Sequence, residues 1–200
     1  PGGSLSAADI ITALYFRFMN IDPQNPTWED RDRFILSKGH ACPVWYAALC
    51  ERGFFEKSHL NTLRKLNSIL QGHADMKKTP GVDMTVGSLG QGICAGIGMA
   101  LSGKLRKKDY HVWVMGDGES QEGAVWEAAM AGAKWKLDNL TVILDDNGIQ
   151  NDTYVVDVMP VESLADKWRA FHWRVLEVDG HDMQAVVDAL EPALSVKGEP

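Results

Sequence analysis

Two short motifs contain the residues best suited to bind a charged ligand. One is Gly-Asp-Gly at 116–118, which directly follows an apolar run at 112–115, and the other is Asn147-Gly148, just after the apolar run 140–144. Asp117 and Asn147 are one strand–helix–strand unit apart. If the two runs are neighbouring parallel strands, both side chains reach the same edge of the sheet. Carboxylate and amide oxygens suit Mg²⁺ or Ca²⁺ and do not suit zinc.

The glycines and the helix that follows them suit a phosphate ligand of that metal. Gly118 lets the backbone approach an anion closely, and the start of the next helix offers free N–H groups and a positive dipole end. Each motif alone is better explained as a tight turn. Together, at two strand ends one crossover apart, they favour a metal–diphosphate site.

The elements that must position these motifs follow from hydrophobic periodicity and turn residues. Ser6 and Asp9 resemble a helix capping box, and Asp182 is a candidate N-cap. Residues 72–92 form a long glycine-rich loop, which in a compact domain is usually functional or mobile. Strands alternating with helices predict an α/β fold, a doubly wound and mostly parallel sheet with helices on both faces. The expected helices are 6–20, 43–52, 92–101, 121–137, 161–171 and 183–194, and the expected strands are 34–36, 110–115, 140–144 and 173–178.

Composition excludes several other classes of protein. The net charge is −7 and no basic patch dominates, so we expect neither nucleic-acid binding nor association with a membrane. The three cysteines, Cys42, Cys50 and Cys94, form no C-x-x-C pair and are typical of reduced thiols in a cytoplasmic protein. We expect one domain over residues 1–200. Because the chain begins at Pro1, we also expect it to be a section of a longer protein.

Five sequence blocks, in order, resemble the N-terminal, diphosphate-binding section of transketolase. They are PGGSLSAADI, DRFILSKGHACPVWYAAL, QGHADMKKTPGVDMTVGSLGQG, the stretch GDGESQEGAVWEAAMAGAKWKLDNLTVILDDNGI, and KWRAFHWRVLEVDGHD. The fourth block is similar to the thiamine-diphosphate motif, which opens with GDG and closes with an asparagine about thirty residues later. The resemblance covers nearly the whole chain, and it is closest to the N-terminal subunit of split, two-polypeptide transketolases.

The resemblance implies a role for particular residues. The metal ligands are Asp117, Asn147 and the main-chain carbonyl of Ile149. The cofactor-binding residues are His40, Gly87, Ser88, Leu89, Gly118, Glu119 and Asn147, with 87–89 beside the thiazolium and aminopyrimidine rings. The catalytic residues are His40 and His73, which line the cofactor and substrate channel, and Glu122, which joins a network of acids across the subunit interface. Taken alone, the two histidines are explained equally well as loop residues whose hydrogen bonds are satisfied.

The resemblance also implies a reaction and a partner. The expected enzyme transfers a two-carbon ketol unit between sugar phosphates, using thiamine diphosphate and Mg²⁺ (or Ca²⁺). A pyrimidine-binding domain, on a C-terminal transketolase subunit, would complete the site in a homodimer or heterotetramer. Two alternatives remain at this point. One is another thiamine-diphosphate enzyme, either decarboxylating or similar to deoxyxylulose-phosphate synthase, and the other is a non-catalytic partner subunit.

Overall fold

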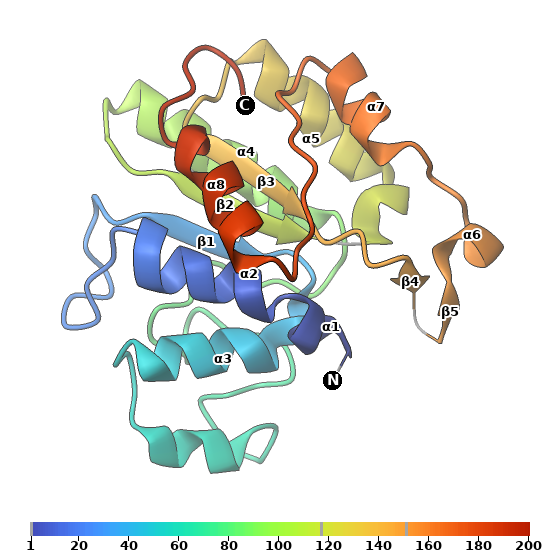
Figure 1. Cartoon of the computed structure of the whole chain (residues 1–200). Helices are drawn as coiled ribbons and strands as arrows, with labels where there is room; N and C mark the ends of the chain where they lie inside the picture. Colours follow the sequence, from blue (N-terminus) through green and yellow to red (C-terminus); the bar gives the residue numbers. More distant parts are fainter. Residues whose placement is uncertain (1, 117, 151) are drawn as a thin grey trace.

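Three parallel strands form the central sheet, in the order β1-β2-β3 (Figure 1). The computed structural model describes residues 2–116, 118–150 and 152–200. Phe34 of β1 (Arg33–Leu36) pairs with Trp113 of β2 (Val112–Gly116), and Val114 of β2 pairs with Val142 of β3 (Leu140–Leu144). Parallel neighbours require crossover connections, which here contain helices. The predicted α/β class and the three strands are confirmed.

Helices cover both faces of this sheet (Figure 1). A short hairpin of β4 and β5, followed by α6, projects from the main body beyond the end of β3. No helix among the described residues is long and apolar enough to cross a membrane. The helices are α1 (Gly2–Ser6), α2 (Ala8–Ala13), η1 (Leu14–Phe18), η2 (Gly39–Ala41), α3 (Cys42–Glu51), η3 (Lys57–Thr62), α4 (Gln91–Leu105), η4 (Gly118–Gln121), α5 (Gly123–Lys134), α6 (Val155–Val158), α7 (Leu164–Ala170) and α8 (Met183–Ala193), and the hairpin strands are β4 (Ile149–Gln150) and β5 (Thr153–Tyr154).

The side chains of the strands belong to two hydrophobic cores, one on each face of the sheet. Alternate side chains of β1 and β2 point to opposite faces, because successive residues of a strand do so. Phe34 and Trp113 pack with α2, α3 and α8, whereas Ile35 and Val114 pack with α4, α5 and α7. β2 is fully buried along its length, which explains its unbroken apolar sequence.

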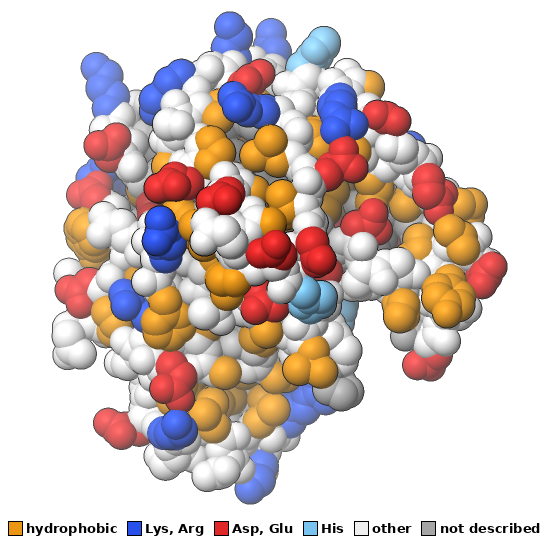
Figure 2. All heavy atoms as spheres, in the orientation of Figure 1, with side chains coloured by type: hydrophobic (Ala, Val, Ile, Leu, Met, Phe, Trp, Pro, Cys, Tyr) orange, Lys and Arg blue, Asp and Glu red, His pale blue; other side chains and the backbone are white. Residues whose placement is uncertain are grey.

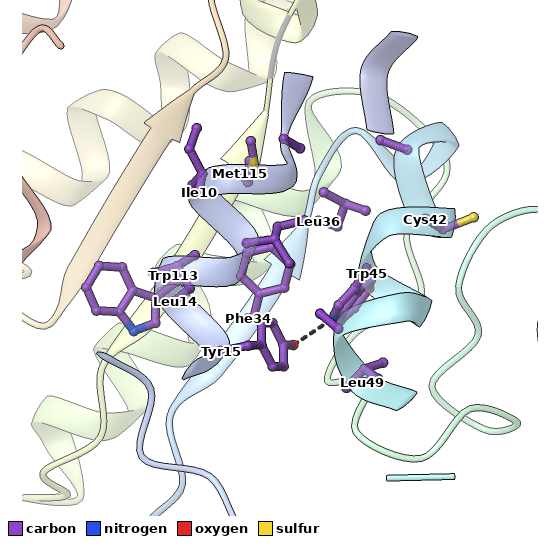
Figure 3. Close-up of a cluster of buried hydrophobic side chains, with 14 of the residues drawn as sticks. Ile10, Leu14, Tyr15, Phe34, Leu36, Cys42, Trp45, Leu49, Trp113 and Met115 are labelled. Atoms are coloured by element: carbon purple, nitrogen blue, oxygen red, sulfur yellow. Dashed lines mark hydrogen bonds between the residues drawn. The ribbon is translucent and has the colours of Figure 1, made fainter. Parts of the chain in front are cut away.

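Aromatic rings fix α3 and the π-helical turn η1 against β1 (Figure 3). The ring of Phe34 lies edge-on to Tyr15 and Trp45, at centroid distances of 5.6 and 5.2 Å. The indole N–H of Trp45 donates a hydrogen bond to the hydroxyl of Tyr15, so both polar groups are satisfied inside the core. This packing holds the carboxyl end of β1 and the start of α3 in a fixed relation.

The N-terminal helix differs from the prediction. The continuous helix expected over 6–20 is divided into α1, α2 and η1, and Ala7 precedes α2 without a side-chain cap. Ser6 is not a capping residue, because its hydroxyl donates a 2.6 Å hydrogen bond to Oδ1 of Asp145. The capping box was therefore wrong, whereas the predicted N-cap Asp182 accepts bonds from the N–H groups of Gln184 and Ala185.

The strand predicted at 173–178 is not formed. A cavity of about 850 Å³ separates this segment from β3, and both line its walls. The N–H of Arg174 donates instead to the carbonyl oxygen of Pro200, at 2.9 Å. Strand pairing needs a ladder of hydrogen bonds to a neighbour, and the segment obtains none from β3. Trp173 is still buried in the second core, whereas Leu176 and Val178 are 52% and 49% exposed, so only the first residue of the segment is buried as a sheet strand would be.

His111, which directly precedes β2, is buried and makes stability depend on pH. Its Nε2 atom lies 2.8 Å from Oγ1 of Thr141, and its backbone N–H donates to Asp32. Burial, and to a lesser degree the charge of Lys197, lowers the pKa of His111 from 6.5 to about 4. Between these two pKa values the unfolded chain binds a proton that the folded chain does not.

We therefore expect stability to decrease as the pH falls from 6.5 towards 4, by about 3 kcal/mol from this group. Above pH 6.5 the contribution is fully present. Urea unfolding at pH 7 and at pH 4.5 measures the difference. In a His111→Gln variant the pH slope should be shallower than in the wild type. An unchanged slope would mean that other groups set the acid sensitivity.

Candidate functional site

The ends of β2 and β3 lie side by side, as the two motifs require. Gly116 is opposite Leu144 in the parallel register, and the N–H of Asp145 donates to the carbonyl oxygen of Gly116 at 2.8 Å. The residues that follow these strands therefore start from adjacent positions on one edge of the sheet. Asp117 lies outside the described residues, so its role as a metal ligand stays a prediction.

Asn147 and Ile149 form an exposed loop after β3. The amide oxygen of Asn147 accepts a hydrogen bond from the N–H of Ile149, at 3.0 Å. Such a turn keeps this oxygen at the surface and fixes its direction. Ile149 then begins β4, opposite Tyr154, and its side chain is 56% exposed. The loop offers an amide oxygen and main-chain carbonyls, which are the neutral oxygen donors that a hard divalent cation takes.

Glu119 joins three segments of the site below the surface. Its side chain is buried, and Oε2 accepts hydrogen bonds from Oγ of Ser37 at 2.6 Å and from the N–H of Gly90 at 2.7 Å. Ser37 directly follows β1, and Gly90 ends the loop before α4. A carboxylate with charge-assisted bonds to two elements fixes their spacing. Glu119 thus supports the site from within, and its expected contact with the cofactor stays a prediction.

His73, near the start of the glycine-rich loop 72–92, lies between the turn after β1 and residues 87–89 of the same loop. A methyl group built on Gly39 would lie 2.9 Å from Cδ2 of His73, and one built on Gly87 would lie 3.8 Å from it. The ring is exposed on its other side. Ser88 is exposed as well, whereas Leu89 is half-buried. The structure therefore brings His73 and the 87–89 loop together, as expected of one binding surface.

His40 occupies a separate hollow beside α1. The hollow has a volume of about 290 Å³ and is lined by Gly3, Ser4, His40, Pro43, Leu63 and Arg64. The hydroxyl of Ser4 donates to the carbonyl oxygen of Ala41 at 3.2 Å, which holds α1 against the turn that carries His40. Arg64 was not singled out from the sequence. No motif surrounds it, and only the folded loop places it near His40.

Glu122 is exposed at the N-cap position of α5, where its side chain makes no capping hydrogen bond. It lies beside Gly90, where a methyl group would approach its Cβ to 2.9 Å. An exposed carboxylate at this position is accessible to another chain. Its role in an interface network stays a prediction.

A buried ion pair lies at the same end of the sheet and was not predicted from the sequence. Nζ of Lys38, directly after Ser37, contacts Oδ2 of Asp145, and the side chains are 0% and 8% exposed. A lysine that follows a buried strand is not distinctive in a sequence. Only the order of the three strands reveals that the ends of β1 and β3 face each other across β2.

Comparisons with known proteins agree with this arrangement. Residues 1–200 match the family described as transketolase, thiamine diphosphate binding domain. The chain is 48% identical to the 6-deoxy-6-sulfo-D-fructose transketolase subunit SqwG of Clostridium sp. (strain MSTE9), with all of this chain and 73% of that relative aligned. It is 44% identical to an apulose-4-phosphate transketolase subunit of Phocaeicola vulgatus, over 93% of this chain and 66% of that one.

Solved structures agree as well. The transketolase from Campylobacter jejuni superposes with a TM-score of 0.90 at 29% identity, covering 98% of this chain and 35% of that one. The transketolase from Leishmania mexicana gives 0.89 at 30% identity, covering 99% and 34%. The chain thus spans about a third of the length of these solved enzymes. With a family match over its whole length, the chain belongs to the transketolase family and corresponds to that family's thiamine-diphosphate-binding domain.

Proposed function

We propose that this chain supplies the cofactor-binding half of a transketolase, which transfers a two-carbon ketol unit from a ketose phosphate to an aldose phosphate. The observation that carries the proposal is the meeting of three features at one edge of the sheet. These are the loop with Asn147, the loop 87–89 beside His73, and the buried carboxylate of Glu119 that spaces β1 from α4.

In this proposal the chain's oxygen donors hold the metal. Asp117, Asn147 and the carbonyl of Ile149 would hold Mg²⁺ (or Ca²⁺), and Gly118 would leave room for the diphosphate that the cation neutralises. Asn147 and Ile149 lie in an exposed loop with hard donors, which fits such a cation. Gly87, Ser88 and Leu89 border the cofactor's rings. When bound, thiamine diphosphate supplies the carbon nucleophile and electron sink that exchange of a carbon–carbon bond requires.

The chain's own side chains would then bind the sugar and handle protons. His40 and His73 would donate hydrogen bonds to substrate hydroxyl and carbonyl oxygens and exchange protons with them, because an imidazole ring carries both a donor and an acceptor nitrogen. Glu122 is placed to continue an acid network into a neighbouring chain. Both histidines are exposed, so a substrate can reach each of them from solvent.

We also infer a partner that carries a pyrimidine-binding domain, in a homodimer or heterotetramer. Two of the relatives above are named as subunits of a transketolase. Tyr154 of the hairpin, Val156 of α6 and Met159 directly after α6 are between 56% and 64% exposed. Figure 2 shows this group of hydrophobic side chains at the projecting end of the molecule. Apolar groups clustered beside a cofactor loop suit an interface that closes over the cofactor.

Co-expression with a chain that carries a pyrimidine-binding domain tests the proposal. We expect the purified complex to transfer ketol units only when thiamine diphosphate and Mg²⁺ are both present, and to lose activity with a chelator. The donor panel includes ketose phosphates, 6-deoxy-6-sulfo-D-fructose and apulose 4-phosphate, since relatives are named for the last two. Release of CO₂ from pyruvate instead would favour a decarboxylating enzyme. A complex that binds no cofactor would favour a non-catalytic subunit.

A further inference from the structure

A buried ion pair links the two outer strands of the sheet at the edge that carries the site. Lys38 follows β1 and Asp145 directly follows β3, and β2 lies between these strands. The ammonium group is fully buried and the carboxylate nearly so. The pair therefore lies across the carboxyl end of β2. Asp117 is the next residue in the sequence after this strand.

Both carboxylate oxygens and the backbone N–H of Asp145 have partners among the described residues. Oδ2 contacts Nζ of Lys38, Oδ1 accepts from the hydroxyl of Ser6 at 2.6 Å, and the backbone N–H donates to Gly116. The carboxylate is thus turned into the protein, away from the exposed loop that begins at the next residue. Its orientation is fixed from β1, β2 and α1 together.

An ion pair in this position needs an explanation beyond stability. Replacing a buried pair by apolar side chains is often neutral or stabilising, because removing two charges from water is costly. Here the pair lies two residues before Asn147, at the base of loop 145–149. Groups that orient the ligands of a metal commonly account for a 10- to 100-fold effect on metal affinity.

We propose that Lys38 and Asp145 are positioning residues for the metal-binding loop 145–149, and that the hydroxyl of Ser6 helps to fix the orientation of the Asp145 carboxylate. The inference rests on the proposed function, since it assigns the metal to this loop. Lys38 neutralises Asp145 and holds its carboxylate away from the cation. The loop then presents the amide oxygen of Asn147 and its main-chain carbonyls at a fixed distance from β2.

A Lys38→Met variant tests this role in the complex with the pyrimidine-domain partner. The measurement is the Mg²⁺ concentration that half-saturates thiamine-diphosphate binding, followed by tryptophan fluorescence well below the melting temperature. We expect it to rise about 10-fold or more. Lys104→Met is the matched control. Lys104 forms an ion pair at 2.9 Å with Asp138, just before the amino end of β3 and therefore at the end of the sheet away from the site. That control should stay within about twofold of the wild type.

A double variant, Lys38→Met with Asp145→Asn, separates positioning from folding. It leaves no unpaired buried charge, so the melting temperature should recover towards that of the wild type while the Mg²⁺ requirement stays raised. Recovery of both quantities would overturn the proposal. So would an unchanged Mg²⁺ requirement in the folded Lys38→Met variant.

If Lys38→Met does not fold, Ser6→Ala is a milder substitution that tests the same positioning of Asp145. It removes one hydrogen bond to Asp145, and Ser195→Ala, which removes a hydroxyl hydrogen bond to the carbonyl oxygen of Pro192 away from the site, is its control. We expect a threefold or larger rise in the Mg²⁺ requirement for Ser6→Ala only. Equal values for the two variants would refute the role of Ser6. If the wild-type complex binds no thiamine diphosphate with Mg²⁺, the proposed function itself fails, which is a distinct result.

Discussion

Asp117→Ala is expected to abolish Mg²⁺-dependent binding of thiamine diphosphate, with an affinity loss of more than about 100-fold. Asp117 is the one carboxylate among the three proposed ligands, so its removal takes away the only formal charge that the protein offers the cation. Amide and carbonyl oxygens alone compete poorly with water for a hard divalent ion. Titration of the partnered complex with cofactor, at saturating and at zero Mg²⁺, measures the effect.

The control for this experiment is Asp152→Ala, which removes an exposed carboxylate from the nearby hairpin turn. It should change the cofactor affinity less than threefold. If Asp117→Ala binds the cofactor as tightly as the wild type, the metal does not use this aspartate. The assignment of the site to the ends of β2 and β3 would then be wrong.

Gly116→Ala should destabilise the protein by about 3 kcal/mol or more. A methyl group at this position would lie 2.0 Å from Oε1 and 2.9 Å from Cδ of Glu119. Glu119 would have to move, and the buried hydroxyl of Ser37 and N–H of Gly90 would lose their acceptor. Unsatisfied buried donors of this kind are costly because no water replaces the bond. Urea unfolding of the chain measures the loss.

Gly98→Ala is the matched control, with the same chemical change inside α4. No atom lies within 4 Å of a methyl group built there, and the position is exposed. Alanine is the better helix former, so this variant should gain up to about 1 kcal/mol. Similar values for the two variants would show that Glu119 shifts without loss and that its hydrogen bonds do not fix the site.

The sheet was predictable because its strands are short, mostly apolar runs, with β1 and β2 almost entirely buried. The runs at 34–36, 110–115 and 140–144 contain few polar residues, and the structure places strands within one or two residues of each. Their neighbour relation followed from the length of the intervening segment, which suits one crossover helix. For the same reason the carboxyl ends of β2 and β3, where the two motifs begin, were correctly expected to lie side by side. Both inferences depend on local pattern and chain length alone.

Contacts between distant segments were not predictable in this way. Ser6 has the sequence context of an N-cap, yet its hydroxyl bonds to Asp145, which is 139 residues away. The apolar run at 173–178 is equally consistent with a strand and with an extended segment, and the hydrogen bond of Arg174 to Pro200 belongs to the second. The burial of Lys38 could not be predicted from the sequence, because a buried charge needs a partner, and only the fold brings Asp145 next to it.

The open flank of β3 has a consequence for how the protein matures. Among the described residues no strand pairs with the outer edge of β3, and the cavity beside it is bounded by apolar side chains such as Leu140 and Val142. Unpaired edges of this kind recruit strands from other copies, and newly made chains are the most exposed to it. Light scattering during refolding should therefore rise steeply with chain concentration, because pairing between copies depends on their encounter.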